Sequence, residues 1–319
     1  MMKILLTFFL SISLLNICRS NGINGIHSHT STQTKTGFNG QTSIPKSTTP
    51  LLHSHDISYR PTDSIRVEKM LAAARRFSRP PVSWLLHFGY QFIGTPYVGG
   101  TLDRAEKERL VVNLRELDCT TFVEQALALA RCAQRGDTSF HSFCDQLCYI
   151  RYIGGKVEYT KRQHYFTTWI NDNQKEQIVK DIQSPTPPFT AIQTIRVDYM
   201  TTHTSSYKML YAHPEWLAGI RNLEQDINGL RYRYIPKALL ANQKLIRTAI
   251  RDGDIIIIIL TNKRGLDTSH IGLAVWRNGN LHMLNASSIH KKVIDEPMTL
   301  YQYMQRHPSQ IGIRICRMN

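Results

Sequence analysis

Cysteine is scarce in this chain, with six residues among 319. That count is too low for a fold held together by disulfides. The six are Cys18, Cys119, Cys132, Cys144, Cys148 and Cys316. If Cys18 leaves with a signal peptide, the remaining number is odd. At least one thiol then stays free in an oxidising compartment, unless another chain pairs with it.

Acidic residues are also few, with 24 against 39 basic ones, which gives a formal net charge of +15. Such a surplus suits an anionic partner: a nucleic acid, a membrane surface or a carboxylate-rich substrate. The basic residues are scattered along the chain, and no nucleic-acid-binding fingerprint accompanies them. We therefore disfavour nucleic acid as the partner.

Long apolar runs are absent beyond the N-terminus. There, residues 4–17 form an apolar run that is too short to span a bilayer comfortably and that fits a signal peptide. Small residues suit cleavage after Ser20. Cys18 is an alternative site of lipid attachment, although the residues before it make a poor lipobox. We predict a signal peptide over 1–20 and hence an exported protein, with no membrane-spanning segment.

No internal repeat or linker divides the rest of the chain. Residues 21–60 are rich in small polar residues and lack periodic hydrophobicity, which predicts a disordered tether. From Ser64 apolar residues recur at helical spacing, and a second helix is expected over 83–91. We predict a single folded domain over 61–319.

A strong amphipathic helix is predicted over 114–134. Its apolar stripe consists of Phe122, Val123, Ala126, Leu127 and Ala130. Asp118 is a candidate N-cap, and Thr121 and Glu124 have the spacing of a capping box. Cys119 falls in the first turn, where free N–H groups and the helix dipole favour a thiolate and lower the thiol pKa. The alternative is a buried structural cysteine.

The second half of the chain predicts an antiparallel sheet. Residues 255–260 are six consecutive apolar residues, mostly β-branched, which indicates a buried central strand. Two further apolar runs, 270–276 and 281–286, flank an Asn-Gly pair at 278–279, which is a strong hairpin signal. Helices first and a sheet afterwards indicate an α+β fold.

The hairpin register brings a histidine and an amide together. With a two-residue turn at 278–279, counting back places Gly272 opposite Asn285 and His270 opposite Ser287. Asn285 is then diagonal to His270, within reach of a side-chain hydrogen bond. A slip of one residue would move Asn285 to the other face.

An imidazole oriented by an amide can accept a proton from a thiol. Cys119, His270 and Asn285 would then form the thiol version of the catalytic triad. The alternative is that His270 is an ordinary core or surface histidine, since the chain has 13.

Two other clusters are less specific. Cys144 and Cys148 lie four residues apart near His141, but without a clear fourth ligand a disulfide or two core cysteines is favoured over a metal. A cation, a histidine and two aromatic residues lie close together in the sequence after residue 160. These are Arg162, His164, Tyr165 and Trp169. They suit a sugar or carboxylate ligand, or they form an ordinary helix face.

Three motifs resemble those of the NlpC-type cell-wall peptidases, which are papain-like cysteine hydrolases of peptidoglycan. They are Gly-Thr-Pro-Tyr-Val-Gly-Gly at 94–100, Leu-Asp-Cys-Thr-Thr-Phe-Val-Glu at 117–124 and Ser-His-Ile-Gly at 269–272. Further blocks are similar to the N-acetylmuramoyl-L-alanine amidase-like family. They lie at 110–114, 162–169, 234–237, 253–255 and 265–267. The resemblance runs from about residue 65 to the end. It implies a papain-like fold with an N-terminal helical part and a nucleophile-bearing helix packed on an antiparallel sheet.

The resemblance also implies roles for single residues. Cys119 matches the nucleophile and His270 the base, and Asn285 stands where the family often has a histidine. Tyr97 matches a tyrosine near the reacting centre, where we expect it to support the oxyanion together with Asp118.

Substrate contacts are the remaining implied roles. Arg162 and His164 match positions that we assign to substrate binding. We add three neighbouring residues to this set. They are Tyr165, Trp169 and Ser269.

The implied reaction is hydrolysis of the amide between N-acetylmuramic acid, in its 1,6-anhydro form, and L-alanine in muropeptides. We expect a periplasmic enzyme of muropeptide recycling with no cofactor and no metal. One alternative is an endopeptidase that cuts between D-glutamate and the diamino acid of the stem peptide. An alternative of another class is a non-catalytic module that binds peptidoglycan.

Overall fold

The computed structural model describes residues 56–77, 83–260 and 265–319. The predicted signal peptide, Cys18 and most of the predicted tether lie outside these ranges. Strand β1 (Ile57–Ser58), at the end of the predicted tether, pairs in parallel with β2 (Leu110–Val111). The folded unit therefore begins before residue 61, earlier than predicted.

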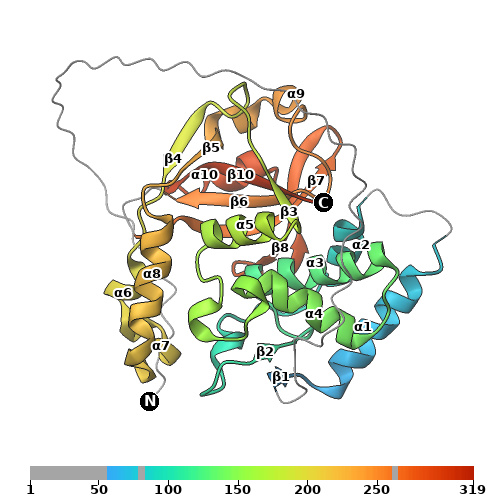
Figure 1. Ribbon diagram of the computed structural model, residues 1–319. Helices are drawn as coiled ribbons and strands as arrows, with labels where there is room; N and C mark the ends of the chain where they lie inside the picture. The colour runs from blue at the N-terminus through green and yellow to red at the C-terminus, as the bar shows by residue number, and fades with distance from the viewer. Residues whose placement is uncertain (1–55, 78–82, 261–264) are drawn as a thin grey trace, which may run out of the picture. The chain divides into compact units, whose positions relative to one another are not determined.

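Helices make up most of the first half of this unit (Figure 1). They are α1 (Pro61–Ala74), α2 (Trp84–Tyr90), α3 (Cys119–Arg135), α4 (Phe140–Arg151) and α5 (Phe166–Lys175). The shorter later helices are α6 (Tyr199–Thr202), α7 (Lys208–Ala212), α8 (Leu217–Ile227), α9 (Gln243–Ile246) and α10 (Leu300–Gln305). Within the described ranges, no helix has the length and apolar character needed to cross a bilayer.

An antiparallel sheet, with the shorter helices between its strands, dominates the second half, which confirms the α+β prediction. The order of its strands is β4 (Ala191–Thr194), β5 (Arg231–Pro236), β10 (Gln310–Met318), β6 (Ile255–Leu260), β7 (Thr268–Arg277), β8 (Asn280–Ser287) and β9 (Lys292–Asp295). Strand β3 (Val179–Ile182) also pairs with β10.

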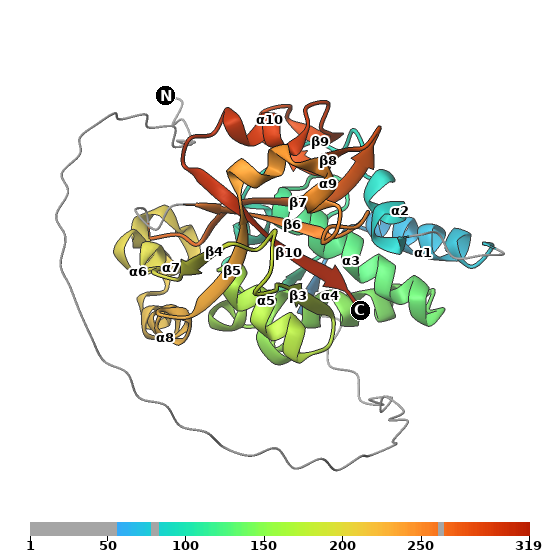
Figure 2. The same ribbon diagram turned by 90° about the horizontal axis from the view of Figure 1, so that it is seen from above.

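Strand β6 is central and buried on both faces, as predicted from its apolar run. Ile255 and Ile257 pack into the core that includes α3. Ile256 and Ile258 point the other way, into a second core that includes α10. Figure 2 shows α10 beside β8 and β9. Helices α3 and α10 thus pack on opposite faces of the sheet.

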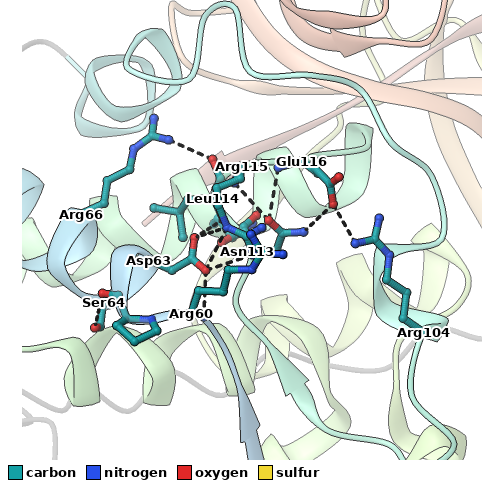
Figure 3. Close-up of polar contacts among 11 residues, drawn as sticks. Arg60, Asp63, Ser64, Arg66, Arg104, Asn113, Leu114, Arg115 and Glu116 are labelled. Carbon is teal, nitrogen blue, oxygen red and sulfur yellow. Dashed lines mark hydrogen bonds and ion pairs between the residues drawn. The ribbon is translucent and has the colours of Figure 1, made fainter.

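Helix α3 begins at Cys119, five residues later than predicted. Two side chains accept hydrogen bonds from backbone N–H groups just before the helix (Figure 3). Asp63 Oδ1 accepts from the N–H of Leu114 at 3.1 Å, and Asn113 Oδ1 accepts from the N–H of Glu116 at 3.2 Å. Leu117 then forms an isolated bridge with Tyr97. These bonds hold residues 113–117 outside the helix, because the N–H groups are already paired.

The cap of α3 also differs in part from the prediction. Asp118 is the N-cap, as predicted, and its Oδ1 accepts from the N–H of Thr121 at 2.8 Å. Its capping-box partner is Thr121, which accepts from the N–H of Asp118. Glu124 was expected in this box, but its carboxylate accepts from Nε of Arg151 at 2.7 Å inside the core. A buried cation in reach is a stronger partner than a single N–H group.

The hairpin has the predicted turn and register. Asn278 and Gly279 both have positive φ, 50° and 76°, as the two-residue type I′ turn requires. Pairing runs from Arg277 opposite Asn280 back to Leu273 opposite Leu284, where the pairing of β7 with β8 ends. The segments with His270 and Asn285 lie beyond that point.

The remaining described cysteines are free and buried: Cys132, Cys144, Cys148 and Cys316. The pair at 144 and 148 is therefore two core cysteines and not a disulfide. His141 contacts Asp145 at 3.6 Å. Among the residues that the structure describes, no group of three or more His, Cys, Asp and Glu side chains could hold a metal ion.

Candidate active site

Cys119 is the first residue of α3, directly after the capping Asp118, and its side chain is partly exposed. The sulfur accepts a hydrogen bond from the backbone N–H of Ile271 on β7. Since Ile271 follows His270 directly, this bond places the thiol beside the strand segment that carries the imidazole. The contact lies where the pairing of β7 with β8 has ended.

His270 is held by an amide on the neighbouring strand. Its Nε2 lies 3.0 Å from Oδ1 of Asn285, which is fully buried. An amide oxygen only accepts, so Nε2 carries the proton and Nδ1 has a free lone pair. The predicted contact between these two residues is present. A Cβ added at Gly272 would lie 2.6 Å from Cγ of Met283, so glycine keeps the two strands close beside this contact.

The site holds a neutral thiol and a neutral imidazole in the free protein. Burial and, to a smaller extent, the nearby Asp118 carboxylate raise the pKa of Cys119 to about 12. Hydrogen bonds from Ile271 and Thr120 act in the opposite direction and lower it. Burial lowers the pKa of His270 to about 4, and the hydrogen bond that the imidazole donates to Asn285 opposes that shift. The expectation of a lowered thiol pKa was wrong. Burial and an adjacent anion outweigh the start of the helix.

Tyr97 lies close to the thiol, as expected. Burial raises its pKa above the usual range for tyrosine, and Cys119, Asp118 and Tyr303 add to that rise. Its backbone N–H donates to the carbonyl of Lys291 at 2.9 Å. Tyr97 is therefore fixed between the segment before α3 and the turn that leads into β9.

Tyr303 on α10 was missed by the sequence analysis. Its ring centroid lies 6.3 Å from that of His270 and 4.6 Å from that of His307, so the tyrosine adjoins both imidazoles. Burial, with the nearby Cys119 and Glu296, raises its pKa to about 12. No local pattern identified this residue, because only the tertiary fold brings α10 to the imidazole.

The expected substrate-binding cluster is largely buried. Arg162 pairs with Asp103 at 2.5 Å and with Glu108 at 3.3 Å, and it is 6% exposed. Tyr165 is 2% exposed and donates from its hydroxyl to Glu224 at 2.7 Å. These contacts give both side chains a role in packing.

Trp169 has no exposed surface and packs in the main core, so it offers no platform to a ligand. His164 is partly buried and donates from Nε2 to the carbonyl of Tyr159 at 2.8 Å. Ser269 differs from the others because it is exposed and adjoins His270. Its hydroxyl accepts from Nε2 of Gln310 at 3.3 Å. Of the five expected contacts, Ser269 alone is exposed, and it precedes His270 in the chain.

Acid should destabilise this fold partly through His164. Burial, then the charge of Arg162, lowers the pKa of His164 to about 3, whereas an unfolded imidazole titrates near 6.5. Between those values the unfolded chain binds the extra proton, so this contribution to stability is complete above pH 6.5 and is lost as the pH falls through about 3. Urea unfolding at several pH values should show a steeper loss for the wild type than for His164→Gln. Parallel pH profiles for the two proteins would contradict the assignment.

A family model described as AmiA-like, N-acetylmuramoyl-L-alanine amidase-like, matches residues 87–313. This range contains Cys119, His270 and Asn285. A search of curated proteins found no match.

Solved structures are similar over most of the chain. An N-acetylmuramoyl-L-alanine amidase from Bacteroides uniformis is 35% identical with a TM-score of 0.67, over 74% of this chain and 98% of that one. A Bacteroides fragilis protein named as a candidate xylanase is 38% identical with a TM-score of 0.67, over 73% and 100%. A Legionella pneumophila protein is 23% identical with a TM-score of 0.61, over 81% and 94%, and at that identity it shows the fold alone.

Proposed function

The chain belongs to the N-acetylmuramoyl-L-alanine amidase-like family, and we propose that it cuts the amide between N-acetylmuramic acid and L-alanine with Cys119 as its nucleophile. Membership of this family identifies the protein as an amidase-type hydrolase of peptidoglycan. The nucleophile, the scissile bond and the 1,6-anhydro form of the sugar are the proposal.

One pair of contacts carries the proposal. The sulfur of Cys119 accepts from the N–H of Ile271, and the adjacent His270 is held by Asn285 at 3.0 Å. A thiol and an oriented imidazole with a free Nδ1 are the two reactants of cysteine hydrolysis. Most glycosidases need a pair of free carboxylates at the reacting centre. The carboxylate next to the thiol, Asp118, instead caps the helix by accepting from the N–H of Thr121.

The reaction begins with proton transfer, because both groups are neutral in the free protein. Nδ1 of His270 takes the thiol proton as the sulfur of Cys119 bonds to the scissile carbonyl carbon. The backbone N–H of Cys119 and the hydroxyl of Tyr97 would stabilise the oxyanion. The imidazolium then protonates the L-alanine nitrogen, the C–N bond breaks, and a thioester of the muramic lactyl group remains. Water, deprotonated by His270, hydrolyses the thioester and frees the thiol.

Digestion of defined muropeptides tests the scissile bond. The amidase releases a free sugar acid and an intact stem peptide, whereas an endopeptidase leaves the sugar attached to a shortened stem. Mass spectrometry of products from anhydro and reducing-end substrates separates these outcomes. Products cut after D-glutamate would replace the proposal by the endopeptidase alternative. Binding without any product would replace it by a non-catalytic module.

We also propose that the protein works in the periplasm. The support is the apolar N-terminal run at 4–17 and the cell-wall substrate of the family. Cleavage after Ser20 yields a soluble form, and lipid attachment at Cys18 would yield an anchored one. Fractionation of cells that express the full chain, compared with a chain lacking residues 1–20, tests both forms.

Asn285→Ala should lower kcat by about tenfold to a hundredfold, less than loss of the base itself. The imidazole would lose the acceptor that fixes its proton on Nε2, while the thiol and the base remain. Steady-state kinetics on a muropeptide measure the effect. Asn173→Ala is a matched control, because it removes another buried amide that donates to Ile150 and Trp169. An Asn285→Ala enzyme with the wild-type kcat would exclude the orienting role.

A further inference from the structure

The turn between β8 and β9, residues 288–291, adjoins the segment that carries Tyr97. The N–H of Tyr97 donates to the carbonyl of Lys291 at 2.9 Å, and Pro96 forms an antiparallel bridge with Lys292. The chain at 94–97 therefore runs beside β9 as a further edge. This pairing brings two lysines to the rim of the site.

The pairing register sets the face on which Lys292 lies. Lys292 pairs with Ser287, and Asn285 is two residues away on the same strand, so all three share one face of the sheet. That face carries the amide that holds His270. Val293 points the other way and is fully buried in the main core. Because neighbouring strands lie about 4.8 Å apart, the base of the Lys292 side chain is one strand from Asn285.

Both lysines are exposed, and neither forms an ion pair among the residues that the structure describes. The acidic side chains near them have other partners. Glu296 lies 3.4 Å from the imidazole of His290, and Asp295 pairs with Arg277 at 3.0 Å. Two cations beside the strand that carries Asn285 are therefore available to an anion from solution.

Lys291 is also held in an uncommon backbone conformation. Its φ is 58°, in the left-handed region that non-glycine residues seldom adopt. Its carbonyl accepts from Tyr97, which ties this conformation to the position of the tyrosine. The backbone of the lysine pair is thus hydrogen-bonded to that of Tyr97 at the edge of the site.

We propose that Lys291 and Lys292 bind a carboxylate of the stem peptide on the leaving-group side of the scissile amide. This proposal rests on the proposed function, because it takes L-alanine and the residues after it as the leaving group. In an extended peptide each residue spans about 3.5 Å, so the carboxylate of the second stem residue lies one residue beyond L-alanine. The lysines would then set a preference for stems with a free carboxylate at that position over amidated stems.

The test compares two substrates that differ in one group, a stem with the free carboxylate on its second residue and the same stem with that carboxylate amidated. The variant is the double substitution Lys291→Gln and Lys292→Gln, which removes both charges and keeps each side chain polar, although one bond shorter. On the acidic substrate we expect KM to rise about tenfold with kcat unchanged, the size expected for two exposed charge pairs. On the amidated substrate we expect the same KM as the wild type.

Lys180→Gln is the matched control, because Lys180 is an exposed lysine on β3. Strand β3 pairs with β10, and β10, β6, β7 and β8 separate it from β9. This control should leave the KM for both substrates unchanged. An equal rise in KM for both substrates, or none for either, would overturn the proposal. If the wild type cleaves neither substrate, the proposed function itself fails, and this inference fails with it. If the double variant keeps the wild-type preference for the acidic stem over the amidated stem, the lysine site alone is overturned.

Discussion

Cys119→Ala will abolish muropeptide hydrolysis, with a loss of at least about 10⁴-fold, while the protein stays folded. Without the sulfur no thioester can form, and His270 has no proton to accept. The substitution removes one atom from a partly exposed side chain, so the packing of α3 changes little. Product mass spectrometry measures the activity, and the thermal unfolding midpoint measures the fold.

Cys132→Ala is the control for this substitution, because Cys132 is a buried thiol on the same helix, far from the first turn. Its loss should lower stability slightly by leaving a small cavity, but kcat should stay near the wild-type value. Full activity in Cys119→Ala would mean that another group attacks the amide. Equal losses in both variants would point to damage to the helix and not to a missing nucleophile.

Local patterns predicted the elements that position the site. The apolar stripe of α3, the run of isoleucines in β6 and the Asn-Gly turn each depend on residues close together in the sequence. The turn mattered most, because a two-residue loop fixes the register of both strands. The contact between His270 and Asn285 follows from that register.

What the sequence could not predict depends on distant residues. Helix α3 starts late because Asp63, about fifty positions earlier, takes the N–H of Leu114 (Figure 3). Trp169 was expected to face a ligand, but helical spacing does not reveal which face the rest of the fold covers. Tyr303 reaches His270 from a short helix after β9, and no motif marks it.

The thiol pKa is a further case of this kind. The start of a helix favours a thiolate, and that argument needs only the sequence around Cys119. Burial and Asp118 act in the opposite direction and have the larger effect in the folded protein. The sequence could not supply the degree of burial. The base therefore becomes essential at neutral pH, since the thiol does not ionise unaided.

His270→Gln should lower kcat by about 10³-fold at neutral pH, near the middle of the range for loss of a general base. With the pKa of Cys119 at about 12, almost no thiolate exists without a base. Raising the pH from 7 to 10 should then restore part of the activity of this variant, because hydroxide replaces the imidazole as proton acceptor. The wild type should respond differently: its activity should persist down to about pH 4 and fall below it, as His270 is protonated.

His282→Gln is the control for this prediction. His282 is a buried histidine on β8 whose Nδ1 lies 2.7 Å from a guanidinium nitrogen of Arg277, away from the thiol. Its substitution should affect stability more than the pH dependence of kcat. A His270→Gln enzyme whose kcat did not rise with pH would show that deprotonation of the thiol does not limit it. The imidazole would then act mainly on the leaving amine, and the nucleophile would be ionised by another group.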